Sequence, residues 1–341
     1  MKPTIRDIAT ACGVSKTTVS RFLNKSGYVS KEVADKITAK IEELNYIPSS
    51  TARNLSLRRS NVIGLIVPEV NNPFFGQIFK GISKIADQEQ MSILYCDTDN
   101  NRDKELRAFE TLRGHNICGL IVTPATGGLI NGQVDEEFIK GLKAFDVPIV
   151  LLDRDVEHVS WPGVFTDNVK GAYDATKLLI DQGHKKIATI SGDQGLLIGK
   201  QRLLGYEKAM KEAGLYDESL IYEGNFSIEM GYKRSLEILK TDITAVFSPN
   251  NLTSMGLLKA LQEKSLTMPE DLAVVGFDDI ELLSLLGLNL TVVQRNPGVL
   301  GQKAIQLLLS LIKDGQVEIE KIILEAQIVT RGSEKRINMA D

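Results

Sequence analysis

The chain has 341 residues, of which 43% are hydrophobic and 25% are charged. This length exceeds what one hydrophobic core covers, so two or more domains are expected, and the composition excludes a disordered chain. No apolar run approaches the roughly 20 residues that cross a bilayer, and the N-terminal MKPTIRDIAT lacks the apolar core of an export signal. We therefore expect a cytoplasmic protein with no membrane partner.

Charge is distributed unevenly along the chain. The net charge is −4, yet residues 1–60 hold eleven Lys or Arg against five Asp or Glu, about +6, which leaves about −10 for the remainder. A basic N-terminal segment ahead of an acidic body indicates that this segment contacts a polyanion such as DNA.

The N-terminal segment has the capping signals of three short helices. Thr4 is expected to cap the first helix, Gly13 to end it, and Ser15 to cap the second helix, KTTVSRFLN. A third helix is expected over residues 30–46, with Pro48 ending it.

Two short helices joined by a turn that contains glycine match a helix-turn-helix, whose second helix enters the major groove of DNA. The exposed start of that helix carries polar side chains that can reach bases or phosphates, and an arginine can donate two hydrogen bonds to guanine. These residues are Lys16, Thr17, Thr18, Ser20 and Arg21. The alternative is a surface helix with incidental polar residues.

After residue 61, short β-branched runs alternate with amphipathic helices. Strands are expected within residues 61–70, 91–99, 117–125, 147–155, 163–168, 186–193, 220–225, 245–250, 272–279 and 290–295. This alternation is typical of parallel sheets covered on both faces, and the number of units exceeds one sheet. The fold class is therefore α/β, with a helical head and a body of two similar subdomains.

Several long stretches resemble one known family. They are TIRDIATACGVSKTTVSRFLN, VSKEVADKITAKIEELNYIPSSTARNL, GLIVPEVNNPFF, DNVKGAYDATKLLIDQGHKKIATISG, RLLGYEKAMKEAGL and MPEDLAVVGFDDIE. Across nearly the whole chain, the sequence resembles the lac-repressor (LacI/GalR) family of bacterial transcription regulators. This implies a DNA-binding domain at 1–48, a hinge linker at 49–60 and a ligand-binding and dimerisation domain at 61–341. Its N-subdomain is expected at about 61–162 and 293–324, and its C-subdomain at about 163–292 and 325–341.

The resemblance also implies that the linker folds into a hinge helix on DNA. Leu55 matches the family's leucine that wedges into the minor groove, and Arg53, Arg58 and Arg59 beside it can contact phosphates. The alternative is that Leu55 merely packs within a linker. The candidate DNA-binding residues are Thr4, Ser15, Lys16, Thr17, Thr18, Ser20, Arg21, Asn24, Arg53 and Leu55.

The body resembles periplasmic sugar-binding proteins, whose subdomains close over a ligand at the carboxyl ends of their strands. Aromatic faces and charged or amide groups, the groups that bind sugars, match ligand-contacting positions of the family. The candidates are Asn72, Phe74, Phe75, Asp153, Arg154, Arg202, Phe226, Asn250, Asp278 and Arg295. A single strand-end Asp or Asn is more often a cap or turn residue, but so many candidates at one expected cleft favour binding.

One candidate departs from the ribose-binding members. Arg295 aligns with their contacting glutamine, and can pair with Asp278 or meet a carboxylate or phosphate of the ligand. Leu196 and Ile198 stand where the purine-binding members have polar contacts, which argues against a purine. A neutral sugar such as ribose is therefore favoured slightly over a sugar acid or sugar phosphate.

Two other classes of protein compete with a regulator. A nucleotide-dependent enzyme would need a phosphate cradle, and neither G-x-G-x-x-G after a strand nor G-x-x-x-x-G-K-[ST] occurs. A transport-associated sugar-binding protein would need export and no DNA-reading head. We expect a repressor of carbohydrate genes that is not an enzyme. It is expected to bind a palindromic operator and a carbohydrate effector.

The chain ends at RGSEKRINMAD without a leucine heptad, so a homodimer is expected. The three cysteines and three histidines are scattered, so neither a cofactor nor a metal is expected. A phosphocarrier-protein corepressor stays open.

Overall fold

The computed structural model describes residues 3–24, 26–46, 60–130, 133–157, 159–315 and 321–336. The chain divides into two compact units, Met1–Asn61 and Val62–Asp341, which are treated separately below. No helix in the described ranges is long and apolar enough to cross a membrane.

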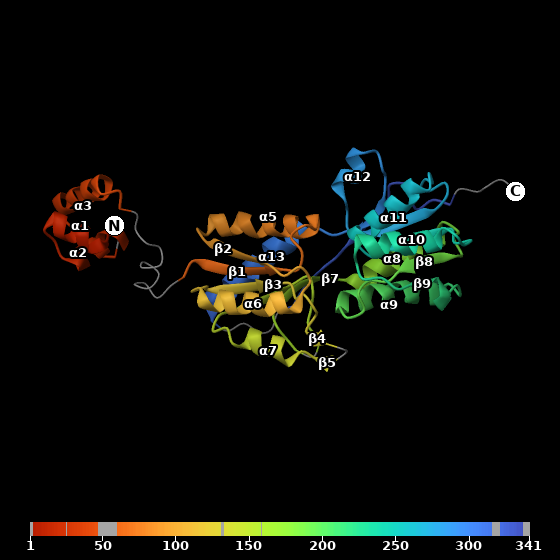
Figure 1. The fold of residues 1–341 in the computed structure, drawn as a ribbon, viewed down its shortest axis with the longest axis horizontal. Coiled ribbons are helices and arrows are strands. Elements are labelled where there is room, and N and C mark those ends of the chain that lie inside the picture. The colour runs from red at the N-terminus through yellow and green to blue at the C-terminus, as the bar shows by residue number, and fades with distance from the viewer. Residues whose placement is uncertain are drawn as a thin grey trace. The chain divides into compact units, whose positions relative to one another are not determined.

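The first unit is a bundle of three short helices, α1 (Ile5–Cys12), α2 (Lys16–Asn24) and α3 (Lys31–Glu43), drawn in red in Figure 1. Each helix contributes one fully buried aliphatic side chain to a shared core, namely Ile8, Val19 and Ile37. A core of this size holds the helices in one arrangement and leaves their outer faces to solvent.

The expected caps of the first two helices are present. The backbone N and hydroxyl of Thr4 donate to the carboxylate of Asp7 at 2.7 and 2.8 Å. Gly13 has φ of 66°, a left-handed conformation that suits glycine at a helix end. The hydroxyl of Ser15 accepts a 3.1 Å hydrogen bond from the backbone N of Thr18.

The third helix is shorter than expected. It starts after Ser30, close to the predicted start, but it ends at Glu43 rather than continuing to residue 46. Asn45 adopts a left-handed φ of 46°, which breaks the helical repeat before Pro48 is reached. Pro48 itself lies outside the described residues.

The body contains two six-stranded sheets, each at the centre of one lobe. The first sheet has the order β13-β7-β6-β3-β1-β2 and is parallel throughout. Its strands are β1 (Val62–Val67), β2 (Ser92–Asp97), β3 (Gly119–Val122), β6 (Ile149–Leu152), β7 (Gly163–Thr166) and β13 (Lys321–Leu324). A small hairpin, β4 (Leu129–Ile130) and β5 (Gln133–Val134), lies outside this sheet.

Helices cover both faces of the first sheet (Figure 1). One face packs against α5 (Pro73–Gln88) and α13 (Pro297–Asp314), and the other against α6 (Arg102–Gly114) and α7 (Glu136–Lys143). Strands buried on both faces need apolar side chains in succession, which explains runs such as VIGLIV.

The second sheet has the order β14-β12-β11-β10-β8-β9. Its strands are β8 (Ile187–Ile190), β9 (Ile221–Tyr222), β10 (Ala245–Ser248), β11 (Ala273–Phe277), β12 (Thr291–Gln294) and β14 (Gln327–Val329). Its helices are α8 (Asn168–Asp181), α9 (Leu197–Glu212), α10 (Ile228–Ile238), α11 (Asn251–Glu263) and α12 (Glu281–Leu285), with a short 3₁₀ turn η1 (Glu218–Leu220). Helices α8 and α9 pack together, as do α10 and α11.

The prediction of parallel sheets is confirmed for the two large sheets with one exception, because β14 runs antiparallel to β12. The separate hairpin β4–β5 is antiparallel as well. The chain passes from β13 to β14 with no helix between them. Strand β13 is parallel to its neighbours, so its carboxyl end lies at the edge facing the other lobe, and β14 must start from that edge. It therefore runs opposite to strands that end there.

The chain crosses between the lobes at three places, two of which differ from the expected subdomain boundaries. Strand Gly163–Thr166 pairs with β6, so the first crossing follows residue 166 rather than 162. Strand Thr291–Gln294 pairs with β11, so the second crossing follows residue 294 rather than 292. In both places the backbone hydrogen bonds to a neighbouring strand run to the end of the strand, so the chain leaves the sheet only after its last residue.

Candidate functional site

The face of α2 turned away from the head core carries three of the predicted DNA-binding residues. Lys16, Thr17 and Arg21 are exposed, whereas Val19 is fully buried. Thr17 and Arg21 are four residues apart, one helical turn, so they share a face. No ion pair involves Lys16 or Arg21 within the described residues, so both cations are available to an anionic partner.

The loop that follows α2 supports the arginine. A Cβ built at Gly27 would lie 3.4 Å from Cδ of Arg21, so the aliphatic part of the arginine lies directly over this glycine. The charged end of Arg21 can therefore extend beyond the helix while its stem is held in place.

Several other predicted residues have structural roles in the head. The hydroxyls of Ser15 and Thr18 lie 2.9 Å apart and share a hydrogen bond at the helix start. The side chain of Asn24 donates to the hydroxyl of Ser20 at 3.3 Å. Thr4 is exposed at the start of α1. Arg53 and Leu55 lie outside the described residues, as does nearly all of the predicted hinge at 49–60.

In the body, all ten predicted ligand-binding residues surround one cavity of about 470 Å³. The cavity lies where the carboxyl ends of the strands of the two lobes face each other, and its volume is typical of a small-molecule site. The predicted residues that line it are Asn72, Phe74, Phe75, Asp153, Arg154, Arg202, Phe226, Asn250, Asp278 and Arg295.

The first lobe supplies an amide, two aromatic rings and two charged side chains of opposite sign. Asn72 caps α5 by accepting from the backbone N of Phe74 at 3.1 Å, and the rings of Phe74 and Phe75 pack edge to face at 5.2 Å. Asp153 and Arg154 follow β6 directly. Asp153 has a left-handed φ of 65°, a costly conformation for a non-glycine residue that is found at functional sites.

The second lobe supplies an equivalent set. Asn250 caps α11 through the backbone N of Thr253 and donates its Nδ2 to the carbonyl of Phe226 at 3.0 Å. The ring of Phe226 packs on Gly192, where any Cβ would lie within 2.0 Å of the ring. Asp278 follows β11 and, like Asp153, is left-handed, with φ of 71°.

Arg295 joins the two lobes through both aspartates. Its Nε and Nη2 donate to the two carboxylate oxygens of Asp278 at 2.6 and 2.7 Å, and its Nη1 donates to Asp153. Its guanidinium also lies 4.0 Å from the ring centre of Phe74. Burial disfavours the charged form of Arg295, but the two aspartates outweigh burial and raise the arginine's pKa.

The two other arginines of the cavity make hydrogen bonds with neutral groups only. Arg154 donates to Asn100 and to the carbonyls of Pro124 and Ala125, each at 3.0 Å. Arg202 donates to Asn168 at 2.9 Å and to the carbonyl of Pro249 at 2.5 Å. Its guanidinium stacks at 3.7 Å from the ring centre of Phe277.

The sequence analysis missed other residues that line the cavity. Among them are Glu69, Asn100, Thr126, Asp193, Asn225 and Asn251. Each follows a strand within a few residues, so the position at a strand's carboxyl end could have indicated them. Leu196 and Ile198, noted there as apolar, are buried and also line the cavity. No group of His, Cys, Asp and Glu in the described ranges has the arrangement of a metal site.

The fold and site define a class: a protein with a helix-turn-helix DNA-binding head and a periplasmic-binding-protein-like body that has an internal ligand cavity. Residues 4–49 match the model described as bacterial regulatory proteins, lacI family, and residues 176–334 match the periplasmic binding protein-like domain. The chain is 35% identical to the HTH-type transcriptional repressor PurR of Histophilus somni, over 98% of this chain and 99% of that protein. The chain belongs to the lacI family of ligand-responsive transcription regulators.

Solved structures agree with this membership. The Lac repressor dimer bound to operator and the anti-inducer ONPF matches 98% of this chain and all of that chain, with 26% identity and a TM-score of 0.85. A lacI-family regulator from Enterococcus faecium with bound ribose matches 81% of this chain and all of that chain, with 27% identity and a TM-score of 0.71.

Proposed function

We propose that this protein is a cytoplasmic repressor of carbohydrate genes, which binds a palindromic operator as a homodimer and is controlled by a small carbohydrate in the cavity between its lobes. The observation that carries the proposal is the position of the cavity. Three chain crossings connect the lobes beside it, so a ligand that contacts both lobes changes the angle between them.

The lining of the cavity supports a carbohydrate effector. Aromatic faces at Phe74, Phe75 and Phe226 suit the C–H faces of a sugar ring, and amides and charged groups suit its hydroxyls. The similar regulator from Enterococcus faecium was solved with bound ribose, which supports the same class of ligand. A ligand that changes the operator affinity through the angle between the lobes must have its own affinity changed by the operator to the same extent.

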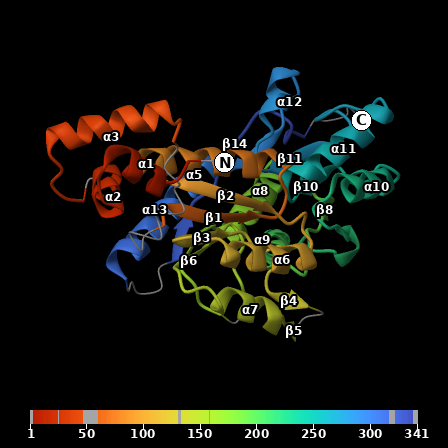
Figure 2. The same ribbon diagram turned by 60° about the vertical axis from the view of Figure 1, so that its left-hand side comes forward.

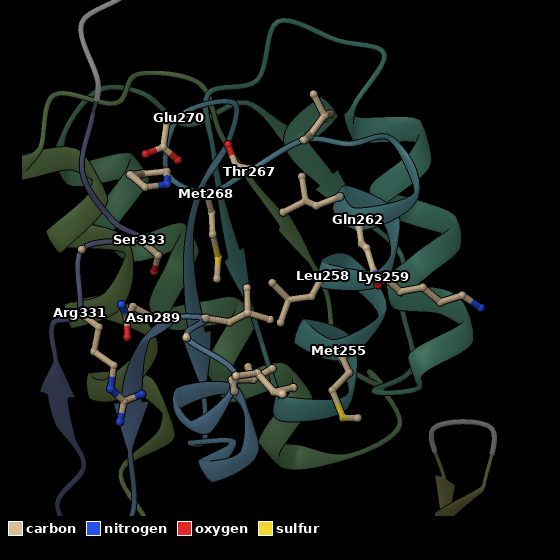
Figure 3. A pocket seen from close by; sticks show the side chains of 18 of the residues that line it. Met255, Leu258, Lys259, Gln262, Thr267, Met268, Glu270, Asn289, Arg331 and Ser333 are labelled. Carbon is tan, nitrogen blue, oxygen red and sulfur yellow. The ribbon is translucent and has the colours of Figure 1, made fainter.

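An apolar surface on the second lobe supports the homodimer. Helix α12 projects from the lobe in two views, and Leu285 and Leu286 on it and beside it are 78% and 66% exposed (Figure 1, Figure 2). Next to α12 lies a pocket of about 910 Å³. Met255 and Leu258 of α11 are among the residues that line it (Figure 3). Exposed apolar surface of this kind marks contact with another chain. The similar Lac repressor structure is a dimer on operator.

One experiment tests the whole proposal. Full-length protein would be used to select its binding sites from random DNA, and its affinity for the selected site would be measured by fluorescence anisotropy with and without pentoses, hexoses, sugar acids and sugar phosphates. We expect a palindromic site and at least one carbohydrate that changes operator affinity about tenfold or more, the usual size of such coupling. Failure to select any DNA sequence would contradict the proposal.

A further inference from the structure

We propose that the effector is an acidic sugar, whose carboxylate or phosphate group binds between Arg154 and Arg202. This rests on the proposed function, since it names the chemical class of the effector in the same cavity. The observation behind it is that Arg295 already binds Asp153 and Asp278, the two buried aspartates of the cavity, whereas the two other arginines have no hydrogen bond to an acidic side chain.

Arg295 occupies three of the four carboxylate oxygens of the two buried aspartates, Asp153 and Asp278. Both oxygens of Asp278 and one oxygen of Asp153 accept from its guanidinium. Neutral sugars donate hydroxyl protons, and charged carboxylates are the acceptors that bind them most strongly. A neutral sugar would have to compete with a buried guanidinium that both aspartates already neutralise.

Arg154 and Arg202, in contrast to Arg295, lack an acidic hydrogen-bond partner. The Nε of Arg154 and the Nη2 of Arg202 are buried and find no hydrogen-bond acceptor in the part of the chain that the structure describes. Burial, followed by the nearby charge of Arg295, lowers the pKa of Arg202 to about 9. Burial lowers the pKa of Arg154 as well. A buried cation without a partner is unfavourable, and an anion beside it removes that penalty.

The other acids near the cavity do not provide this partner. Asp193 lies in a partly exposed loop, where its carboxylate accepts from the backbone N of Gly195 at 2.8 Å. Glu69 is hydrogen-bonded to Asn72, and burial raises its pKa. Glu105, behind the cavity wall, accepts from the backbone N of Ala125 at 2.8 Å. All three attract Arg154 at a distance, but none makes a hydrogen bond with Arg154 or Arg202.

Glu69 and Asp193 line the cavity at partly exposed positions, and among the buried lining residues three arginines stand against two aspartates. They are Arg154, Arg202 and Arg295 against Asp153 and Asp278. Arg154 comes from the first lobe and Arg202 from α9 of the second lobe. An anionic group between them would contact a cation from each lobe, so its binding would favour one angle between the lobes.

The test compares ligands that differ only in charge. Binding of D-glucuronate and of its neutral amide, D-glucuronamide, to the full-length protein would be measured by calorimetry, together with ribose 5-phosphate and ribose. We expect one acid to bind more than about tenfold tighter than its neutral counterpart. The glucuronate pair reports a carboxylate site and the ribose pair a phosphate site. Equal binding within both pairs, or no binding of either acid, would overturn the inference.

A variant then tests the role of Arg295. In Arg295→Gln the two aspartates are released, so they repel an anion and accept sugar hydroxyls, and the preference should reverse toward the neutral compound. The control is Arg102→Gln, which removes a comparable ion pair with Asp135 outside the cavity and should leave the preference unchanged. A preference for the acid that is the same in both variants would contradict the role of Arg295. If Arg295→Gln does not fold, the four ligands with the unmodified protein still decide.

The two proposals fail separately. If ribose or glucuronamide binds as tightly as the acid and changes operator affinity, the regulator proposal stands and the acidic effector is wrong. If an acid binds selectively without changing operator affinity, the acidic site stands and the control of DNA binding by this cavity is wrong.

Discussion

The Nδ2 of Asn251 donates a 2.8 Å hydrogen bond to the Oδ1 of Asn72, although the two residues are 179 positions apart and lie in different lobes. Asn72 caps α5 and Asn251 is the first residue of α11, so the bond connects the N-terminal ends of two helices across the cavity. A ligand that moves the lobes relative to each other must keep, lengthen or break this bond.

Asn251→Ala should therefore alter the response to effector more than it alters stability. The substitution removes the bond to Asn72 and the 2.9 Å bond that the Oδ1 of Asn251 accepts from the backbone N of Leu252, at about 1 kcal/mol each. Asn72 retains its bond to the backbone of Phe74. Effector affinity should change about threefold or more, as measured by calorimetry, with a small shift in the urea midpoint. The control is Asn101→Ala, which removes the cap of α6 outside the cavity lining and should cost similar stability without changing effector affinity.

Arg21→Ala should reduce discrimination between operator and random DNA by about tenfold or more. A bidentate contact to a base is worth about 1–3 kcal/mol of discrimination. Competition binding with operator and random duplexes would measure the ratio. Lys36→Ala, which removes an exposed cation paired with Glu32 on α3, should leave that ratio intact. If Arg21→Ala discriminates between the two DNAs as strongly as the unmodified protein, Arg21 does not read a base.

Leu55→Ala should weaken operator binding while leaving effector affinity unchanged. An apolar wedge acts by unstacking a base step, so its loss removes the DNA bend and the contacts that depend on the bend. Anisotropy with operator and calorimetry with effector would separate the two effects. Equal operator affinity in the variant would show that Leu55 does not act as a wedge.

The cavity residues were predicted from the resemblance to the family, and for some of them a local rule points the same way. Parallel strands end at a common edge, so Asp153 and Asp278, directly after buried strands, had to lie at the same edge of their sheets. All ten expected strands formed, and the central ones, such as β1, β3 and β11, are apolar runs that are buried on both faces. Strand β13, with alternating exposure in its short KIIL segment, gave no such signal.

What Arg295 does could not be predicted from the sequence. Its ion pairs depend on how closely the two lobes approach, and that distance is set by contacts between residues far apart in the chain. Pairing with Asp278 was one alternative, but the simultaneous pairing with Asp153 was not foreseen. The burial of Glu105 could not be predicted either. It lies in the charged segment RDKELRAFETLRG, a composition typical of an exposed helix, yet its side chain is fully buried.

Glu105 should make the protein less stable as pH rises. Burial raises its pKa from 4.5 to about 7, so between these values the unfolded chain loses the proton while the folded protein keeps it. Its contribution to folding is therefore most favourable below pH 4.5 and falls until about pH 7, by about 3 kcal/mol in all.

Glu105→Gln should remove this dependence, because a glutamine keeps an oxygen for the backbone N of Ala125 and carries no charge. Urea unfolding at pH 5 and pH 8 would measure the difference. The variant should gain stability relative to the unmodified protein at pH 8 and much less at pH 5. Parallel stability profiles for the two proteins would show that Glu105 is not responsible.

The apolar surface around α12 should hold the dimer together. Replacing Leu282 and Leu286 by lysine places two charges on a surface that is proposed to be buried between two copies, and a desolvated charge without a partner is strongly unfavourable there. Sedimentation velocity should therefore show a monomer. Because two heads on one dimer bind one palindrome, operator affinity should fall by several orders of magnitude. Effector binding within each body should persist, since the cavity lining does not include α12.

The matched control is Leu204→Lys, which places a charge at an equally exposed leucine on α9 and should leave the dimer intact. A dimer that survives both leucine substitutions would locate the interface elsewhere on the body.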